Sequence, residues 1–133
     1  MALQYSVAVN NARLDSVETT TGATAVLRVR TGAPPANCAA ADTGTVVATL
    51  TLPADWMAAA AAAAKAKSGT WSDGSADANG TAAHFRIYDS TGVTCHIQGT
   101  YGTSATDMIG DSVNFTAGQS FTINTFTINA ANT

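Results

Sequence analysis

The stretch that most suggests chemistry is DGSADANG, residues 73–80, which carries an oxygen-bearing side chain at every second position. Those side chains, spaced like the first ligands of an EF-hand calcium loop, are Asp73, Ser75, Asp77 and Asn79. The match then stops, because the sixth position needs glycine and is Ala78, and the twelfth needs a bidentate glutamate and is His84. We therefore expect a polar connector ending at Gly80, just before a strand, and no calcium site.

The two histidines are the next candidates. His84 and His96 fall on the polar face of one predicted hairpin, whereas Cys95 points to its other face. A zinc site there would need ligands from elsewhere, so we interpret both as sheet-surface histidines. The carboxylates that fall mostly at turns or helix starts, where capping explains them, are Asp15, Glu18, Asp42, Asp55, Asp89, Asp107 and Asp111. With no nucleophile elbow either, the sequence predicts no catalytic residue, no cofactor and no metal ligand, and hence a protein that is not an enzyme.

Two tryptophans, Trp56 and Trp71, bracket a run of seven alanines. They could stack on a sugar, but we expect them to anchor the alanine-rich segment to a sheet. Together with Tyr88 and Tyr101 they keep one alternative open, a carbohydrate-binding or adhesion module.

Composition narrows the classes of function. The 133 residues suffice for one domain, and only 11% are charged, with a net charge of −3. The six basic residues form no cluster, so nucleic acid is not an expected partner. No apolar run approaches the roughly 20 residues of a membrane span, and residues 1–16 lack the pattern of a secretory signal. We expect a cytoplasmic site of synthesis, no membrane partner, and a weakly hydrated surface suited to assembly.

The two cysteines, Cys38 and Cys95, are expected to remain reduced in the cytosol. Oxidation could follow if the mature protein leaves the cell, so whether they pair stays open.

Period-2 alternation is the strongest structural signal, and it predicts half-buried strands. The predicted inward faces are Leu3, Tyr5, Val7 and Val9, then Leu27 and Val29, then Val46, Ala48, Leu50 and Leu52. Arg28 and Arg30 are placed on the outer face. A short helix is expected between residues 10 and 22, where Leu14 and Val17 lie three apart.

Residues 81–99 permit a predicted register. A three-residue loop, 90–92, would use Gly92 in the left-handed conformation. The expected pairs are Asp89 with Val93, Ile87 with Cys95, Phe85 with Ile97, Tyr88 with Thr94, Arg86 with His96 and His84 with Gln98. One face is then apolar throughout and the other polar throughout, which a buried sheet face requires.

A second hairpin is predicted over residues 113–123, with a loop at 116–118, Val113 opposite Phe121, and Phe115 on the same face. The apolar parity changes after Ile123, so we expect a bulge near Asn124–Thr125 or a strand that crosses between sheets.

The segment 54–67 is alanine-rich, with Asp55 near its start and two lysines near its end, which predicts a helix. Alanine gives such a helix little to bury, so it could equally be a surface arm that orders against a neighbouring subunit. Seven or eight strands with Gly-rich turns indicate an all-β fold, an antiparallel sandwich or jelly roll. We divide the chain into an N-terminal strand or arm with a short helix, 1–24, and a β-sandwich domain, 25–133.

Four stretches occur in a familiar order: LRVRTGAPPA (27–36), GTAAHFRIYDSTG (80–92), GTYGTSATDM (99–108) and AGQSFTINTFTIN (117–129). This order resembles a family of small proteins encoded in the structural gene clusters of tailed bacteriophages and prophages. The resemblance covers most of the chain from Ala25 onward and rests on turn-and-strand patterns. The alanine run 58–64 and the two cysteines lie outside it.

The resemblance implies a virion component. Small virion β-sandwich proteins commonly act as capsid decoration (cement) proteins, so the expected partners are the major capsid protein and further copies of this chain, with a trimer favoured. A tail or collar component is the main alternative, and the carbohydrate-binding module is the second. The resemblance places the protein on the capsid surface of the virion after its synthesis in the host cytoplasm.

Overall fold

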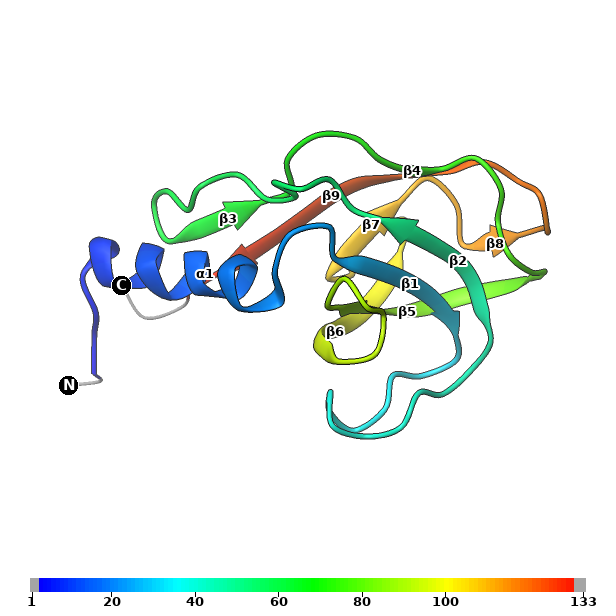
Figure 1. Cartoon of the computed structure of the whole chain (residues 1–133), viewed down its shortest axis with the longest axis horizontal. Coiled ribbons are helices and arrows are strands. Elements are labelled where there is room, and N and C mark those ends of the chain that lie inside the picture. Colours follow the sequence, from blue (N-terminus) through cyan, green and yellow to red (C-terminus); the bar gives the residue numbers. More distant parts are fainter. Residues whose placement is uncertain (1–2, 131–133) are drawn as a thin grey trace.

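The structure, a computed structural model, describes residues 3–130 and is mostly β with one helix (Figure 1). In chain order the elements are α1 (Val7–Thr21), β1 (Val26–Thr31), β2 (Val46–Thr51), β3 (Ala64–Ala66), β4 (Trp71–Asp73), β5 (Gly80–Tyr88), β6 (Cys95–Gly102), β7 (Met108–Gly110), β8 (Asn114–Phe115) and β9 (Phe121–Asn129). Within the described residues, α1 falls short of the length and apolarity of a membrane span. The coarse prediction of an all-β fold with a short helix is confirmed.

The strands form one curled sheet in the order β2-β1-β5-β6-β7-β9-β3, with β4 also paired to β9 and β8 to β5. The curl brings the end that carries β4 back to β2, where the Asp77 N–H donates to the Val47 carbonyl at 2.8 Å. Strand β7 runs parallel to β6, whereas the other pairs are antiparallel. The sheet is therefore mixed, and the expectation of purely antiparallel pairing is wrong.

The apolar core lies inside this curl. Leu27 and Val29 of β1 are fully buried, as the alternation predicts. In β2, Ala48 and Leu50 are buried as expected, and Val47 is buried as well. Both faces of β2 are thus shielded from solvent where the sheet closes on itself.

The β5–β6 hairpin keeps the predicted faces of Phe85, Ile87 and Ile97, but not its predicted register. Ile87 pairs with Ile97 and Phe85 with Gly99, two residues beyond the expected partners, and a bulge follows between Ile87 and Tyr88. The turn is wider than predicted, because the Asp89 N–H donates to the Thr94 carbonyl at 3.0 Å. A shift of two residues preserves the faces up to the bulge, so Phe85 and Ile87 are buried as predicted. Beyond the bulge Cys95 pairs with Tyr88 on the polar face, so its predicted place on the apolar face is wrong.

The second predicted hairpin is wrong in its pairing. Strand β8 pairs with β5, with Phe115 opposite Gly80, and does not pair with β9. Phe115 still shares a face with Phe121, since their rings meet edge-to-face with centroids 4.9 Å apart. The predicted bulge in β9 is confirmed, because Gly110 pairs with Ile123 and Ile109 with Thr125, which leaves Asn124 between them.

The alanine-rich segment is a β-hairpin, and the predicted helix is wrong. Met57 bridges to Lys67 and Ala61 to Ala64, while β3 pairs with β9. At the tip, Ala62 and Ala63 have φ of 51° and 59°, the left-handed values of a tight hairpin turn. Pairing with β9 and burial of Met57 outweigh the helix propensity of alanine, which is a weak local preference.

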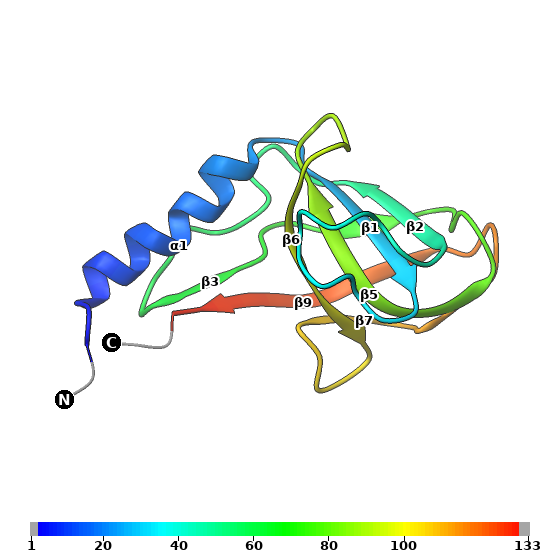
Figure 2. The same cartoon turned by 90° about the horizontal axis from the view of Figure 1, so that it is seen from below.

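The predicted strand at residues 3–9 is also wrong. Helix α1 begins at Val7, and the Ser6 hydroxyl caps it by accepting the Val9 N–H at 3.2 Å. Leu14 is buried as expected, whereas Val17 is only partly covered. Helix α1 packs beside the hairpin 57–67, and together they form a projection from the body that we call the wing (Figure 2).

Candidate functional site

The connector 73–80 uses its oxygen atoms within the chain. It joins β4 to β5, which begins at Gly80 as predicted. The Ser75 N–H donates to Asp73 at 3.0 Å, the Thr49 hydroxyl to Asp77 at 2.7 Å, and the Ala117 N–H to Asn79 at 2.7 Å. The three acceptors thus serve three separate partners, and over residues 3–130 no group of three or more potential metal-ligating side chains gathers.

The two histidines do not share a surface. His84 is fully buried, so its predicted exposure on the sheet surface is wrong, whereas His96 is exposed beside the β6 bulge. His84 Nδ1 lies 2.7 Å from the Gly32 carbonyl, which assigns the proton to Nδ1. Burial lowers the pKa of His84, so the ring is neutral at pH 7.

The tryptophans belong to the core. Trp56 and Trp71 are 0% and 1% exposed, and their ring centroids lie 6.1 Å apart. The Trp56 indole N–H donates to the Gly22 carbonyl at 3.0 Å. Their predicted role as anchors of the alanine-rich segment is confirmed. Tyr88 and Tyr101 are buried too, so none of these four rings offers a face to a sugar.

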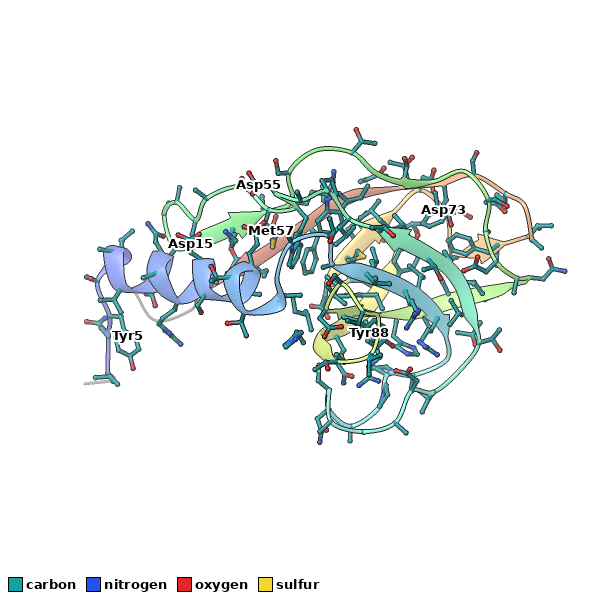
Figure 3. The ribbon with its side chains drawn as sticks, in the orientation of Figure 1. Tyr5, Asp15, Asp55, Met57, Asp73 and Tyr88 are labelled. Carbon is teal, nitrogen blue, oxygen red and sulfur yellow. The ribbon has the colours of Figure 1, made fainter. Side chains whose placement is uncertain are left out.

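Opposite the apolar core, the outer face of β1 and β5 carries a second buried layer, made of polar side chains. Residues 32–45, which we call the cover loop, cross this face (Figure 2). The side chains beneath the loop, with Asp42 from the loop itself, form the polar cluster: Arg30, Asp42, His84, Arg86, Tyr88 and Gln98. Tyr88 marks this layer in Figure 3.

Arg86 organises the polar cluster. It is only 2% exposed, and its guanidinium donates to the carbonyls of Asn37, Cys38 and Ala40 at 3.1, 2.9 and 3.2 Å. It also pairs with Asp42, which Arg30 contacts at 3.0 Å. Burial alone would raise the pKa of Asp42, but hydrogen bonds from Tyr88 and Arg86 outweigh burial and hold the pKa below 3.8. The arginine thus fixes a loop that has no regular structure of its own.

A buried cation also joins the two halves of the wing. Lys65, 2% exposed, lies 2.8 Å from Asp15 and 3.3 Å from Glu18 of α1. Burial by itself would lower the pKa of Lys65, yet the two carboxylates raise it. The same acidic residues accept backbone N–H groups of the hairpin, Asp15 from Ala60 and Glu18 from Met57 (Figure 3). These side chains fix the geometry of the wing.

The outer part of the wing exposes apolar side chains. The large hydrophobic side chains that are exposed among the described residues are Leu3, Tyr5, Val7, Val9 and Val93. Leu3 is 72% exposed, and Val7 and Val9 are nearly half exposed. The first four lie within seven residues at the free end of α1, where Figure 3 labels Tyr5, whereas Val93 lies in the β5–β6 turn. We call residues 3–9 the N-terminal stretch.

A shallow depression of about 370 Å³ lies between β6 and β9. Apolar side chains of Phe85, Ile97, Phe126 and Ile128 line it, with Asp107 at its edge. Asp107 Oδ2 accepts both the N–H and the hydroxyl of Thr100, at 2.9 and 3.0 Å, and so holds the β6–β7 connection in place.

Sequence reasoning missed the polar cluster and the N-terminal stretch. The signal for the cluster was three cationic or polar residues, Arg30, His84 and Arg86, on one face of adjacent strands, opposite an acidic residue in a Gly/Pro/Ala-rich loop. The signal for the stretch was Ser6, a good helix cap, which breaks the apolar alternation.

Comparison of the chain with protein-family models, with curated proteins and with solved structures found no match. The resemblance to tailed-phage structural proteins therefore stays a prediction.

Proposed function

We propose that this protein is a structural component of a tailed-phage virion, and specifically a capsid decoration protein that binds the shell of the major capsid protein through its wing. The observation that carries the proposal is the N-terminal stretch, where four of the five large exposed hydrophobic side chains of the described residues gather. Contiguous exposed apolar surface is unusual on a monomer and is typical of contact sites.

The size of the contact indicates which surface takes part. A stable protein–protein contact buries more than about 1,000 Å² in total. The N-terminal stretch is too small to supply that area alone. The neighbouring surface of the wing is the outer side of the hairpin, with exposed Ala58, Ala59, Ala61 and Ala62. Small uncharged side chains permit close approach, so we include them in the docking surface.

The proposal includes self-association, with a trimer as the favoured unit. Shell symmetry offers three-fold axes, and closed cyclic oligomers satisfy them. Either part of the wing, residues 3–18 or the hairpin, could reach a sibling copy. The sandwich or jelly-roll description also stays part of the proposal, and the curled sheet, which encloses its apolar core on one side and the polar cluster on the other, supports a layered fold.

Of the two alternatives, the tail or collar component remains and the carbohydrate-binding module does not. A tail or collar component would use the same docking surface at far lower copy number, and copy number is what separates it from a decoration protein. The carbohydrate-binding module rested on four aromatic rings that are all buried, so it has lost its basis in this chain. A role without catalysis, and a final location on the virion surface, follow from the same proposal.

The test replaces apolar with charged side chains in the wing. In the variant Leu3→Glu/Val7→Glu both changes lie at exposed positions, so folding should be unaffected, but a charge buried in the contact should abolish loading onto shells. Val93→Glu is the matched control, because Val93 is 78% exposed and lies outside the wing. The measurements are copy number per particle by quantitative gel or mass spectrometry, and the temperature at which particles release DNA.

A decoration protein should be stoichiometric with the major capsid protein, and particles lacking it should release DNA at lower temperature. If the variant Leu3→Glu/Val7→Glu still loads fully onto shells, the wing is not the docking surface. A few copies per particle located near the tail would replace the decoration role with the tail role.

A further inference from the structure

The two cysteines, 57 positions apart in the chain, lie against each other. Cys38 belongs to the cover loop and Cys95 begins β6. Their Sγ atoms are 2.9 Å apart, and the Cys95 thiol also lies 3.4 Å from the Ile97 carbonyl. Both residues are partly exposed, so small solutes can reach the pair.

Contacts other than the sulfur atoms hold the two residues together. Arg86 binds the Cys38 carbonyl at 2.9 Å, and Gln98 of β6 donates to the Pro35 carbonyl at 2.7 Å. On the other side, Cys95 is fixed by pairing with Tyr88 across the hairpin. The polar cluster therefore presents the two thiols to each other before any bond forms.

We propose that Cys38 and Cys95 are an oxidation site, at which a small-molecule disulfide such as oxidised glutathione converts the thiol pair into an intramolecular disulfide. The Cys38 thiolate attacks one sulfur of the oxidant, forms a mixed disulfide and releases one glutathione thiolate. The Cys95 thiolate then attacks the Cys38 sulfur and releases the second. In total, two protons and two electrons leave the protein, and one oxidised glutathione becomes two reduced molecules.

The environment of Cys95 supports this order of attack. Burial, and then the adjacent Cys38 thiol, raise the pKa of Cys95 to about 12. Because Cys95 holds its proton more tightly than an ordinary thiol, we expect the loop cysteine to react first. Once Cys38 is part of the mixed disulfide, its thiol no longer raises the pKa of Cys95, and Cys95 can yield the thiolate of the second step. Once the mixed disulfide has formed, the proximity of Cys95 favours closure over a second intermolecular exchange.

The bond would tie the cover loop to β6 and close a large ring. Cross-links over long loops stabilise the folded state mainly by restricting the unfolded chain. For a ring of this size we expect the melting temperature to rise by roughly ten degrees. The chemistry does not depend on the proposed virion role, because it belongs to the isolated chain.

The experiment treats the purified full chain with oxidised glutathione at pH 8, in parallel with a sample kept in a phosphine reductant. We expect the loss of two hydrogen atoms in the intact mass, no thiol titratable after denaturation, and a proteolytic peptide that joins residues 38 and 95. The oxidised sample should melt at the higher temperature. Reopening the bridge should require at least roughly tenfold more reduced glutathione in native buffer than in urea, since the fold stabilises the bond by as much as the bond stabilises the fold.

Cys38→Ser is the matched control, because it keeps Cys95 but cannot close the ring, and its melting temperature should not respond to the oxidant. Two free thiols after oxidation of the folded protein would overturn the proposal. Stable glutathione adducts without closure, or a bridge that leaves the melting temperature unchanged, would overturn it as well.

Discussion

Replacement of Arg86 by methionine should be among the most damaging single changes outside the apolar core. The substitution keeps most of the side-chain length and removes the charge and all the donors. Three carbonyls of the cover loop and the Gln98 side-chain oxygen lose the Arg86 donor, and Asp42 loses one of its three partners. Methionine fills much of the space, so the cost comes from polar groups left without a partner rather than from a cavity.

The size of the loss in stability depends on the partners that Asp42 keeps in the variant. Removing one member of a buried ion pair usually costs about 3–5 kcal/mol. Here the Asp42 side chain is 39% exposed and keeps Arg30 and Tyr88 as partners, which places Arg86→Met near the lower end, about 3 kcal/mol. For a domain of this size that corresponds to a fall of roughly ten degrees in melting temperature. Arg86→Lys keeps the charge but loses the planar fork, so it should fall between wild type and Arg86→Met.

The assay is urea unfolding of both variants beside Arg28→Met. Arg28 is the matched control, because it lies on the same face of the sheet and is only partly buried, with one hydrogen bond, 2.8 Å, to the Gly92 carbonyl. Its loss should cost at most about 1 kcal/mol. Limited proteolysis supplies a second measurement, since Arg86→Met should expose the cover loop to cleavage while the sheet persists. If Arg86→Met and Arg28→Met cost the same, and the cover loop stays protected, the reasoning about Arg86 is refuted.

Phe85→Ala should lower the free energy of unfolding by about 3–5 kcal/mol, measured in urea. His84→Ala should lower it by about 1–3 kcal/mol, because the Gly32 carbonyl loses its donor. A negligible cost for His84→Ala would mean that the cover loop does not seal this face. Because the pKa of folded His84 is depressed below its unfolded value of 6.5, its contribution is fully present above pH 6.5 and is lost as the pH falls below that value. His84→Gln should therefore flatten the stability profile between pH 7 and the depressed folded pKa, and an unchanged slope in this variant would contradict the reasoning. Ala62→Gly should stabilise the protein by about 0.5–1 kcal/mol, because glycine adopts the left-handed conformation without the strain of alanine. Ala59→Gly, at an exposed position without positive φ, should destabilise the protein. A loss of stability in both variants would mean that the turn is not left-handed.

Local alternation in the sequence was enough to predict the strands in which apolar and polar residues alternate strictly. Leu27 and Val29 against Arg28 and Arg30 in β1 are one example, because a curled sheet imposes that period directly on the chain. The bulge at Asn124 could also be predicted, since a change of parity leaves few other solutions.

Other features depended on contacts that the alternation of residues does not encode, and they could not be predicted. The alanine run becomes a hairpin only because the edge of β9 and the carboxylates of α1 are there to receive it. The turn at residues 89–94 widens because Asp89 accepts backbone groups of Val93 and Thr94, which shifts the register of β6. Both effects outweigh propensities worth less than 1 kcal/mol per residue.

The candidate site was predicted least well, for the same reason. A polar face of a strand predicts exposure to solvent unless another segment covers it. The cover loop has no periodic pattern, so its position over this face could not be predicted from the sequence. The burial of His84 and Arg86 is therefore a tertiary property. The N-terminal stretch shows the opposite error. The apolar alternation at Leu3 and Tyr5 predicts burial in a strand, yet these residues precede a helix and are exposed.

Strand β9 gives the molecule a mechanical character. Its last residues pair with β3 in the wing, and its earlier residues pair with β4 and β7 in the body. A load applied to the wing along the strand would be shared by many ladder hydrogen bonds stretched at once, a shear geometry, rather than opening them one after another. In the proposed role as a decoration protein, a particle under internal pressure would pull on the wing without peeling the sheet. Asn124, where the ladder is interrupted, is where the strand would yield first.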